Sequence, residues 1–136
     1  MIQSPNRLLA TVFGTVLLLV GLVGFFVSTP YPFATPQGGV VIGLFGSNGL
    51  LGSVHVVTGG ILLLSGLIGA RTSKIFGVII GLGFFVLSLY GFFGDHTAGN
   101  VFALNVADNL LHLVIGLGLL VAGLTTDRLF RPVAAA

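Results

Sequence analysis

The sequence predicts an all-α integral membrane protein, a four-helix bundle built from two tandem, parallel helical-hairpin repeats. Hydrophobic residues make up 55% of its 136 residues and charged residues only 6%, whereas average soluble domains carry about 25% charged residues. Four apolar stretches are long enough to cross a bilayer, and the second half of the chain repeats a pattern of the first. We therefore expect residues 1–136 to form a single transmembrane domain whose surface faces lipid.

Each predicted span follows from its length and composition. A hydrocarbon core of about 30 Å needs about 20 apolar residues in helical conformation. Residues 8–27, 50–70, 75–94 and 106–125 meet this requirement, and none of these stretches holds Lys, Arg or Pro. The first is longer than the apolar region of a signal peptide, which has about 7–15 residues, and no small-residue cleavage site follows it. We therefore expect it to remain as a membrane helix.

The cations predict the orientation of the chain. All five Lys and Arg residues fall in segments on one side of the predicted spans, and the loops at 28–49 and 95–105 contain none. Because cytoplasmic loops carry the excess of Lys and Arg, we expect both termini to be cytoplasmic, in a bacterial cytoplasmic or internal (for example photosynthetic) membrane. These cations are Arg7, Arg71, Lys74, Arg128 and Arg131. The pI near 9.7 rests on them and does not indicate binding to nucleic acid.

The longer of the two cation-free loops contains an apolar run at residues 40–45. Six residues are too few to cross the bilayer. We expect this run to form either an interfacial segment or a short re-entrant turn.

An internal repeat divides the chain at its middle. The pattern Asn-x6-His-x3-Gly-x6-Gly-Leu occurs in the second and in the fourth span, displaced by 57 residues, and the first and third spans match at a displacement of 67 residues. We place repeat one at about 7–70 and repeat two at about 74–127. Because each repeat holds two spans, both repeats enter the membrane in the same direction, and their pseudo-twofold axis is expected to lie along the membrane normal.

The pattern Asn-x6-His-x3-Gly, above all at residues 105–116, resembles an uncharacterised family of small bacterial four-helix membrane proteins, catalogued as a domain of unknown function. The resemblance covers nearly the whole chain. It implies the four-helix architecture and brings no activity with it.

His55 and His112 are the main candidates for a functional site. Each shares a helix face with glycines, which favours close helix packing. The predicted packing glycines are Gly52, Gly59, Gly66, Gly116 and Gly123. Two imidazoles at the same depth could hold a haem as paired axial ligands or could each hold a chlorophyll-type magnesium. They could instead be neutral and form interhelical hydrogen bonds, each contributing about 0.6 kcal/mol, or could take part in proton transfer or transport.

Three further polar residues lie near these histidines in the sequence. Asn48 and Asn105 precede the second and fourth spans and are predicted helix caps, because asparagine is a preferred N-cap residue. Asp108 lies four residues before His112 and could orient its imidazole by accepting a hydrogen bond. The second span has Leu51 at the equivalent position, so this pairing is expected in one repeat only.

These patterns lead to a functional hypothesis without catalysis. We expect no catalytic and no metal site, because the chain lacks cysteine and the Asp95-His96 pair has too few ligands. The hypothesis is a non-enzymatic accessory or structural subunit, packed against lipid and against other membrane subunits or itself. The alternatives are a protein that binds haem or a chlorophyll-type pigment through His55 and His112, in which case a redox role remains open, and a small transporter.

Overall fold

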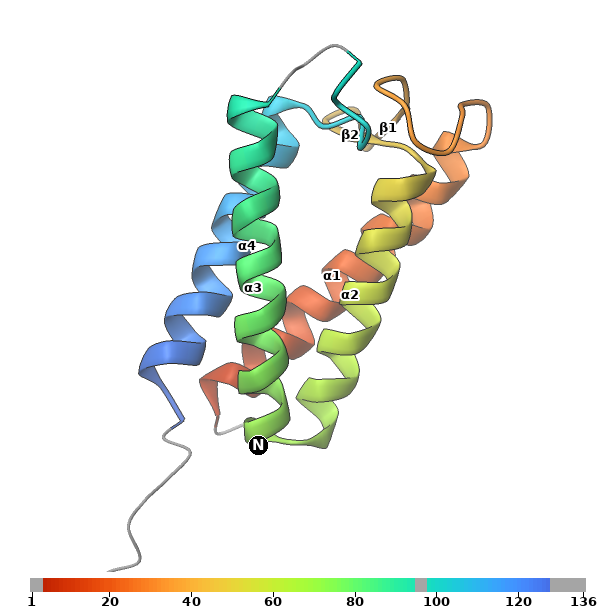
Figure 1. The fold of residues 1–136 in the computed structure, drawn as a ribbon. Helices are drawn as coiled ribbons and strands as arrows, with labels where there is room; N and C mark the ends of the chain where they lie inside the picture. Colours follow the sequence, from red (N-terminus) through yellow and green to blue (C-terminus); the bar gives the residue numbers. More distant parts are fainter. Residues whose placement is uncertain (1–3, 95–97, 128–136) are drawn as a thin grey trace, which may run out of the picture.

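The computed structural model describes residues 4–94 and 98–127 of the chain. Its helices are α1 (Pro5–Ser28), α2 (Gly49–Ile68), α3 (Ala70–Phe93) and α4 (Val106–Thr125), and a two-stranded antiparallel sheet of β1 (Gly39–Val41) and β2 (Phe45–Ser47) lies between α1 and α2 (Figure 1). All four helices are long and apolar enough to cross a membrane. The predicted number and approximate position of the spans are therefore confirmed.

The helix ends differ from the predicted spans where polar residues extend a helix beyond its apolar run. The first helix begins at Pro5, since proline is tolerated at the first helical position, and the Ser4 hydroxyl accepts a hydrogen bond from the Arg7 N–H at 3.2 Å. The third helix begins at Ala70 rather than at residue 75. Its first five residues include Arg71 and Lys74, which a hydropathy pattern does not count as part of a span.

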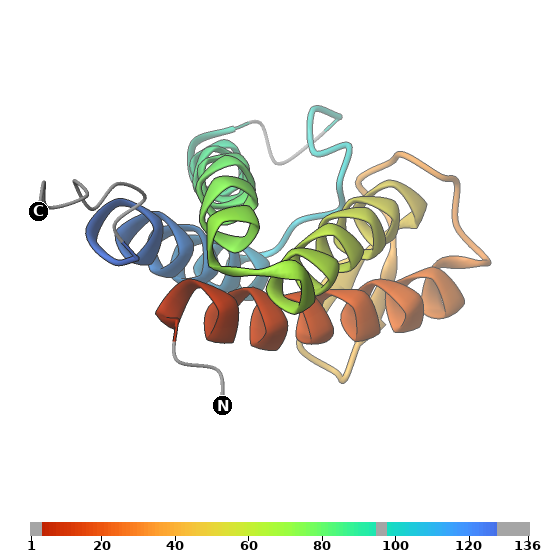
Figure 2. The ribbon, with the colours of Figure 1, turned by 90° about the horizontal axis from the view of Figure 1, so that it is seen from below.

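The helices associate as two close pairs, α1 with α2 and α3 with α4. The first helix also runs obliquely across the bundle and contacts α3 and α4 (Figures 1 and 2). The backbones of α2 and α4, both fully described, do not come within 8 Å of each other at any pair of Cα atoms. Any direct link between these two helices must therefore be made by side chains.

Glycines set the close approach within each helix pair. A Cβ atom added at Gly59 would lie 2.9 Å from the Gly14 carbonyl oxygen, and one added at Gly116 would lie 2.9 Å from the Gly81 carbonyl oxygen. Real Cβ atoms do not approach backbone atoms so closely. The two crossings are thus made backbone to backbone, which is the mode of packing that small residues allow between membrane helices.

The apolar run at 40–45 forms a β-hairpin. Val41 pairs with Phe45, which leaves a loop of three residues between the strands. Its first two residues, Ile42 and Gly43, have positive φ angles (47° and 72°), and the Leu44 N–H donates to the Val41 carbonyl oxygen at 3.1 Å. Figure 2 shows that this hairpin projects beyond α1. The sequence did not predict these strands, because three-residue strands carry too short an alternation of polar and apolar residues to be recognised.

The packing of α3 on α4 can be tested with two alanine substitutions of opposite expected sign. Gly116→Ala places its Cβ 2.7 Å from the Phe85 nitrogen and is expected to lower the free energy of unfolding by about 1–3 kcal/mol. At Gly60, an added Cβ meets no atom within 4 Å. Gly60→Ala should therefore leave the stability unchanged or raise it by up to about 1 kcal/mol, because alanine is the better helix former. Reversible unfolding in mixed micelles measures both, and equal stability of the two variants would contradict the close crossing.

Candidate functional site

The two histidines of the repeated pattern meet inside the bundle. His55 on α2 and His112 on α4 are 2% and 0% exposed, and their Nε2 atoms lie 3.0 Å apart. This is a hydrogen-bond distance, so one Nε2 carries a proton and donates it while the other accepts. Although the backbones of α2 and α4 stay apart, this imidazole pair therefore links the two helices through a side-chain hydrogen bond.

Phe84 on α3 covers the histidine pair. Its ring is stacked on His112, with 5.1 Å between ring centroids and 22° between ring planes. The centroid of His55 lies 6.0 Å from that of Phe84. The pair is therefore enclosed by an aromatic ring from the third helix, and both imidazoles lie in apolar surroundings.

The Nδ1 atoms of both histidines are buried and have no hydrogen-bond partner among the described residues. The imidazole that donates through Nε2 has an unprotonated Nδ1, and the imidazole that accepts at Nε2 carries its proton on Nδ1. Either assignment thus leaves one donor and one acceptor unpaired. A buried unpaired polar group costs about 1–3 kcal/mol, so burying this pair is less favourable than burying two apolar side chains would be. Ionisable residues kept inside a membrane span at such a cost are candidates for a functional role.

The geometry of the pair does not fit paired axial ligation of a haem. Metal–nitrogen bonds to histidine are about 2 Å long, so two nitrogens on opposite sides of one metal ion lie about 4 Å apart. The observed 3.0 Å between the Nε2 atoms leaves no room for a metal and a macrocycle between the rings. Within residues 4–94 and 98–127, no three His, Cys, Asp or Glu side chains gather where they could hold a metal ion.

Asn48 and Asn105 occupy the N-cap positions of α2 and α4. Their side-chain oxygens accept hydrogen bonds from the Leu51 N–H at 2.9 Å and from the Asp108 N–H at 3.0 Å.

The amide groups of these asparagines reach into the other half of the chain. Asn48 Nδ2 donates to the Val101 carbonyl oxygen at 2.7 Å, and Asn105 Nδ2 donates to the Leu44 carbonyl oxygen at 2.9 Å. Each cap therefore also holds the loop that precedes the other cap.

Asp108 does not have the role that its spacing from His112 suggested. Its Oδ2 atom accepts hydrogen bonds from the Asn105 N–H and from the Gly46 N–H, each at 2.9 Å, while His112 Nδ1 has no partner in the described part of the chain. The predicted pairing is absent because a carboxylate at the third helical position turns back towards the N-cap and forms a capping box. Asp108 thus joins β2 to the start of α4.

The predicted packing glycines lie at contacts within the chain. Gly52, Gly59 and Gly66 of α2 face backbone and side-chain atoms of α1. Gly116 and Gly123 of α4 face atoms of α3. These glycine faces are consequently occupied inside each helix pair and are not free for a partner protein.

Two cations cap helix ends at the opposite end of the bundle. Arg7 Nε donates to the Gly66 carbonyl oxygen at 2.9 Å, and Lys74 Nζ donates to the Thr126 carbonyl oxygen at 3.0 Å. Cations are favourable at helix C-termini because of the helix dipole. Arg128 and Arg131, two of the cations that predict the orientation of the chain, lie outside the described residues. The Asp95-His96 pair also lies outside them.

Asp127 closes the same end of the bundle. Partial burial raises the pKa of its carboxyl group, but hydrogen bonds from Ser4 and Asn6 and the nearby charge of Lys74 outweigh this effect and hold the pKa below its usual 3.8. The carboxylate thus joins the start of α1 to the residues that follow α4.

Three buried residues near these contacts were not predicted from the sequence, namely Asn6, Phe84 and Asn109. Phe84 is one of 12 phenylalanines, and nothing in its spacing marks it as the ring that covers the histidines. Asn6 is a polar residue at the edge of the first apolar run, which was the signal that could have identified it. Asn109 is buried against Gly91, where an added Cβ would overlap the asparagine side chain. Its location within the 105–116 segment, three residues before His112, was the signal that could have identified it.

The coupling between the histidines can be measured with a double-mutant cycle. His55→Leu leaves His112 Nε2 without a partner and should cost about 1–3 kcal/mol, and His112→Leu should cost a similar amount. The double variant removes every unpaired imidazole atom, so its loss should be smaller than the sum of the two single losses. The expected difference is about 0.6–1.7 kcal/mol, from the average to the largest coupling measured for interhelical hydrogen bonds in a membrane protein. Unfolding free energies in mixed micelles give the four values, and strictly additive losses would show that the two rings do not interact.

A family model described as a domain of unknown function (DUF4383) matches residues 7–125 of the chain. No curated protein and no solved structure matches it.

Proposed function

The chain belongs to the DUF4383 family, and from that premise we propose that it acts as a non-enzymatic, structural subunit in a membrane. The observation that carries the proposal is the direct 3.0 Å contact between His55 and His112. The two imidazoles hydrogen-bond through their Nε2 atoms, and both Nδ1 atoms are buried, which favours a role in joining two helices over one in presenting a nucleophile or a metal ligand. We further propose that the protein is an accessory subunit of a larger membrane complex or forms a homo-oligomer.

The same proposal includes the tandem arrangement of two parallel hairpins. Its support is the reciprocal pairing of equivalent residues, which is how a twofold interface is built. His55 and His112 are 57 residues apart and contact each other. Leu44 and Val101 are also 57 residues apart, and each accepts a hydrogen bond from the asparagine cap of the opposite repeat.

The cation-capped end of the bundle supports the same symmetry. Arg7 and Lys74, which are 67 residues apart, each donate to carbonyl oxygens at the end of the second helix of their own hairpin. Under this proposal, the two hairpins have the same polarity and equivalent caps, and their axis runs along the membrane normal. The excess of cations at this end favours its cytoplasmic location.

Contact with a partner subunit would use the β-hairpin rather than the glycine faces. Val40, Ile42 and Leu44 alternate along the hairpin and are exposed, Ile42 to 79%. A positive φ angle is unfavourable for a β-branched residue and, where it persists, often marks a functional position. An exposed isoleucine with φ of 47° at the tip of this hairpin is such a position.

The two alternative functions have less support. A haem held by both histidines does not fit the spacing of their Nε2 atoms. A transporter of hydrophilic solutes needs polar groups along its path, whereas the cavity between α2 and α3 is lined by apolar side chains and one threonine.

Purification in a mild detergent, together with native membrane partners, tests the proposed function. We expect a protein without a haem or chlorophyll absorption band that migrates as an assembly on native gels. Ile42→Asn should preserve or raise its thermal stability, since asparagine tolerates left-handed backbone, while the assembly is lost. Tyr31→Asn, a change at another exposed residue outside the hairpin, is the matched control and should keep the assembly.

Two results would contradict the proposal. A visible absorption band that disappears in the His55→Leu variant would establish pigment or haem binding instead. An assembly that survives Ile42→Asn unchanged would rule out the β-hairpin as its contact surface.

A further inference from the structure

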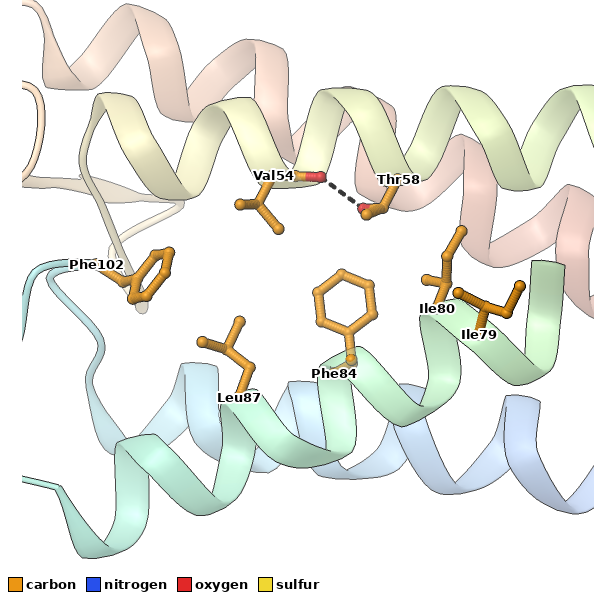
Figure 3. Close-up of a pocket in the computed structure, with 8 residues that line it drawn as sticks. Val54, Thr58, Ile79, Ile80, Phe84, Leu87 and Phe102 are labelled. Atoms are coloured by element: carbon orange, nitrogen blue, oxygen red, sulfur yellow. Dashed lines mark hydrogen bonds between the residues drawn. The ribbon is translucent and has the colours of Figure 1, made fainter.

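A lateral crevice of about 340 Å³ separates α2 from α3. Figure 3 shows its lining side chains pointing towards one another from the two helices, with a phenylalanine from the loop before α4 at one end. Its lining includes Val54 and Thr58 of α2 and Gly83 and Phe84 of α3. We propose that this crevice binds one acyl chain of a membrane lipid.

The depth of the crevice indicates what surrounds its opening. Thr58 lies nine residues after the start of α2 at Gly49, which is about 14 Å along the helix axis. On α3, the lining residues fall between Ile79 and Leu87, in the middle and outer part of a 24-residue helix. The crevice thus opens at the depth of the acyl chains in the leaflet on the β-hairpin side.

The chemistry of the lining selects a hydrocarbon. The single polar side chain among the lining residues is Thr58, and its hydroxyl group donates to the Val54 carbonyl oxygen at 2.6 Å. Since the crevice holds no charged group, it offers little to a polar head group or a hydrophilic solute. An extended acyl chain in this space would restore the dispersion contacts that an empty cavity lacks.

The opposite side of the bundle, between α1 and α4, is filled. Leu17 and Ile115 are 0% and 1% exposed there, and the Phe13 ring reaches α4, with its Cε2 atom 3.5 Å from a Cβ added at Gly118. Under the proposed repeat, Leu17 and Ile115 correspond to Phe84 and Thr58. This comparison rests on the proposed repeat, but the crevice itself does not.

Gly83 and Phe84 of the lining indicate what a chain bound in the crevice would contact. A Cβ added at Gly83 meets no atom within 4 Å, so this glycine keeps the crevice wide. Phe84 lines the crevice and is also the ring stacked on His112. A bound acyl chain would therefore contact the side chain that shields the histidine pair.

Photo-crosslinking in nanodiscs tests the proposal. The probe is phosphatidylcholine with a diazirine in the middle of one acyl chain, and mass spectrometry maps the labelled peptides. We expect labelling at residues 54–58 and 79–87 above that of the other lipid-facing segments. Gly83→Phe, which fills the crevice, should lower this labelling severalfold, whereas Gly60→Phe, at a lipid-facing glycine that does not line it, should leave it unchanged.

Three outcomes would overturn the acyl-chain site: uniform labelling of all four helices, labelling that Gly83→Phe does not reduce, or labelling of residues 54–58 and 79–87 below that of the other lipid-facing segments, which would show that the crevice is covered by protein, such as a second copy of the chain. Thermal melting of both phenylalanine variants verifies that they fold. If Gly83→Phe melts early, Gly83→Leu fills less of the space and carries the same expectation. None of these outcomes bears on the absorption spectrum or on Ile42→Asn, so the proposed function is tested separately.

Discussion

The middle of a bilayer contains no water, and a polar group there must find its partner within the protein. In this chain the constraint falls on two histidines, which lie on helices whose backbones never approach closely. Their mutual hydrogen bond joins the two helix pairs at the centre of the bundle, alongside the contacts of α1 with α3 and α4 and of α2 with α3. Phe84 packs over it, and the apolar core of the bundle surrounds it.

The remaining contacts extend this link towards both ends of the bundle. Close crossings at glycines hold α1 to α2 and α3 to α4, and one histidine lies on each of these helix pairs. At the β-hairpin end, Asn48, Asn105 and Asp108 tie each half to the loop of the other half. At the opposite end, Asp127 joins the start of α1 to the end of α4. Polar side chains therefore join the two halves at both ends of the bundle as well as at its centre.

The sequence predicted those features that depend on local composition and spacing. Hydropathy located four helices, and the recurrence of Asn and His at 57 residues selected the positions that the structure brings together. Contacts between segments that are distant in the sequence could not be predicted in this way. The contact between His55 and His112 depends on how the two helix pairs cross. The Gly46 N–H that binds the Asp108 carboxylate lies 62 residues away in the sequence. The β-hairpin depends on two residues with left-handed backbone within a short apolar run. The use of the glycine faces within the chain, rather than against a partner, likewise follows only from the three-dimensional arrangement.

Nitrogen NMR of the imidazoles tests the central claim most directly. The chain contains three histidines, so ¹⁵N-histidine labelling in nanodiscs gives few signals to assign. The account predicts a through-hydrogen-bond coupling between the Nε2 atoms of His55 and His112, with one of these nitrogens protonated and the other not. An absence of this coupling, with both Nε2 atoms in the same protonation state or shifted by a bound metal, would contradict it.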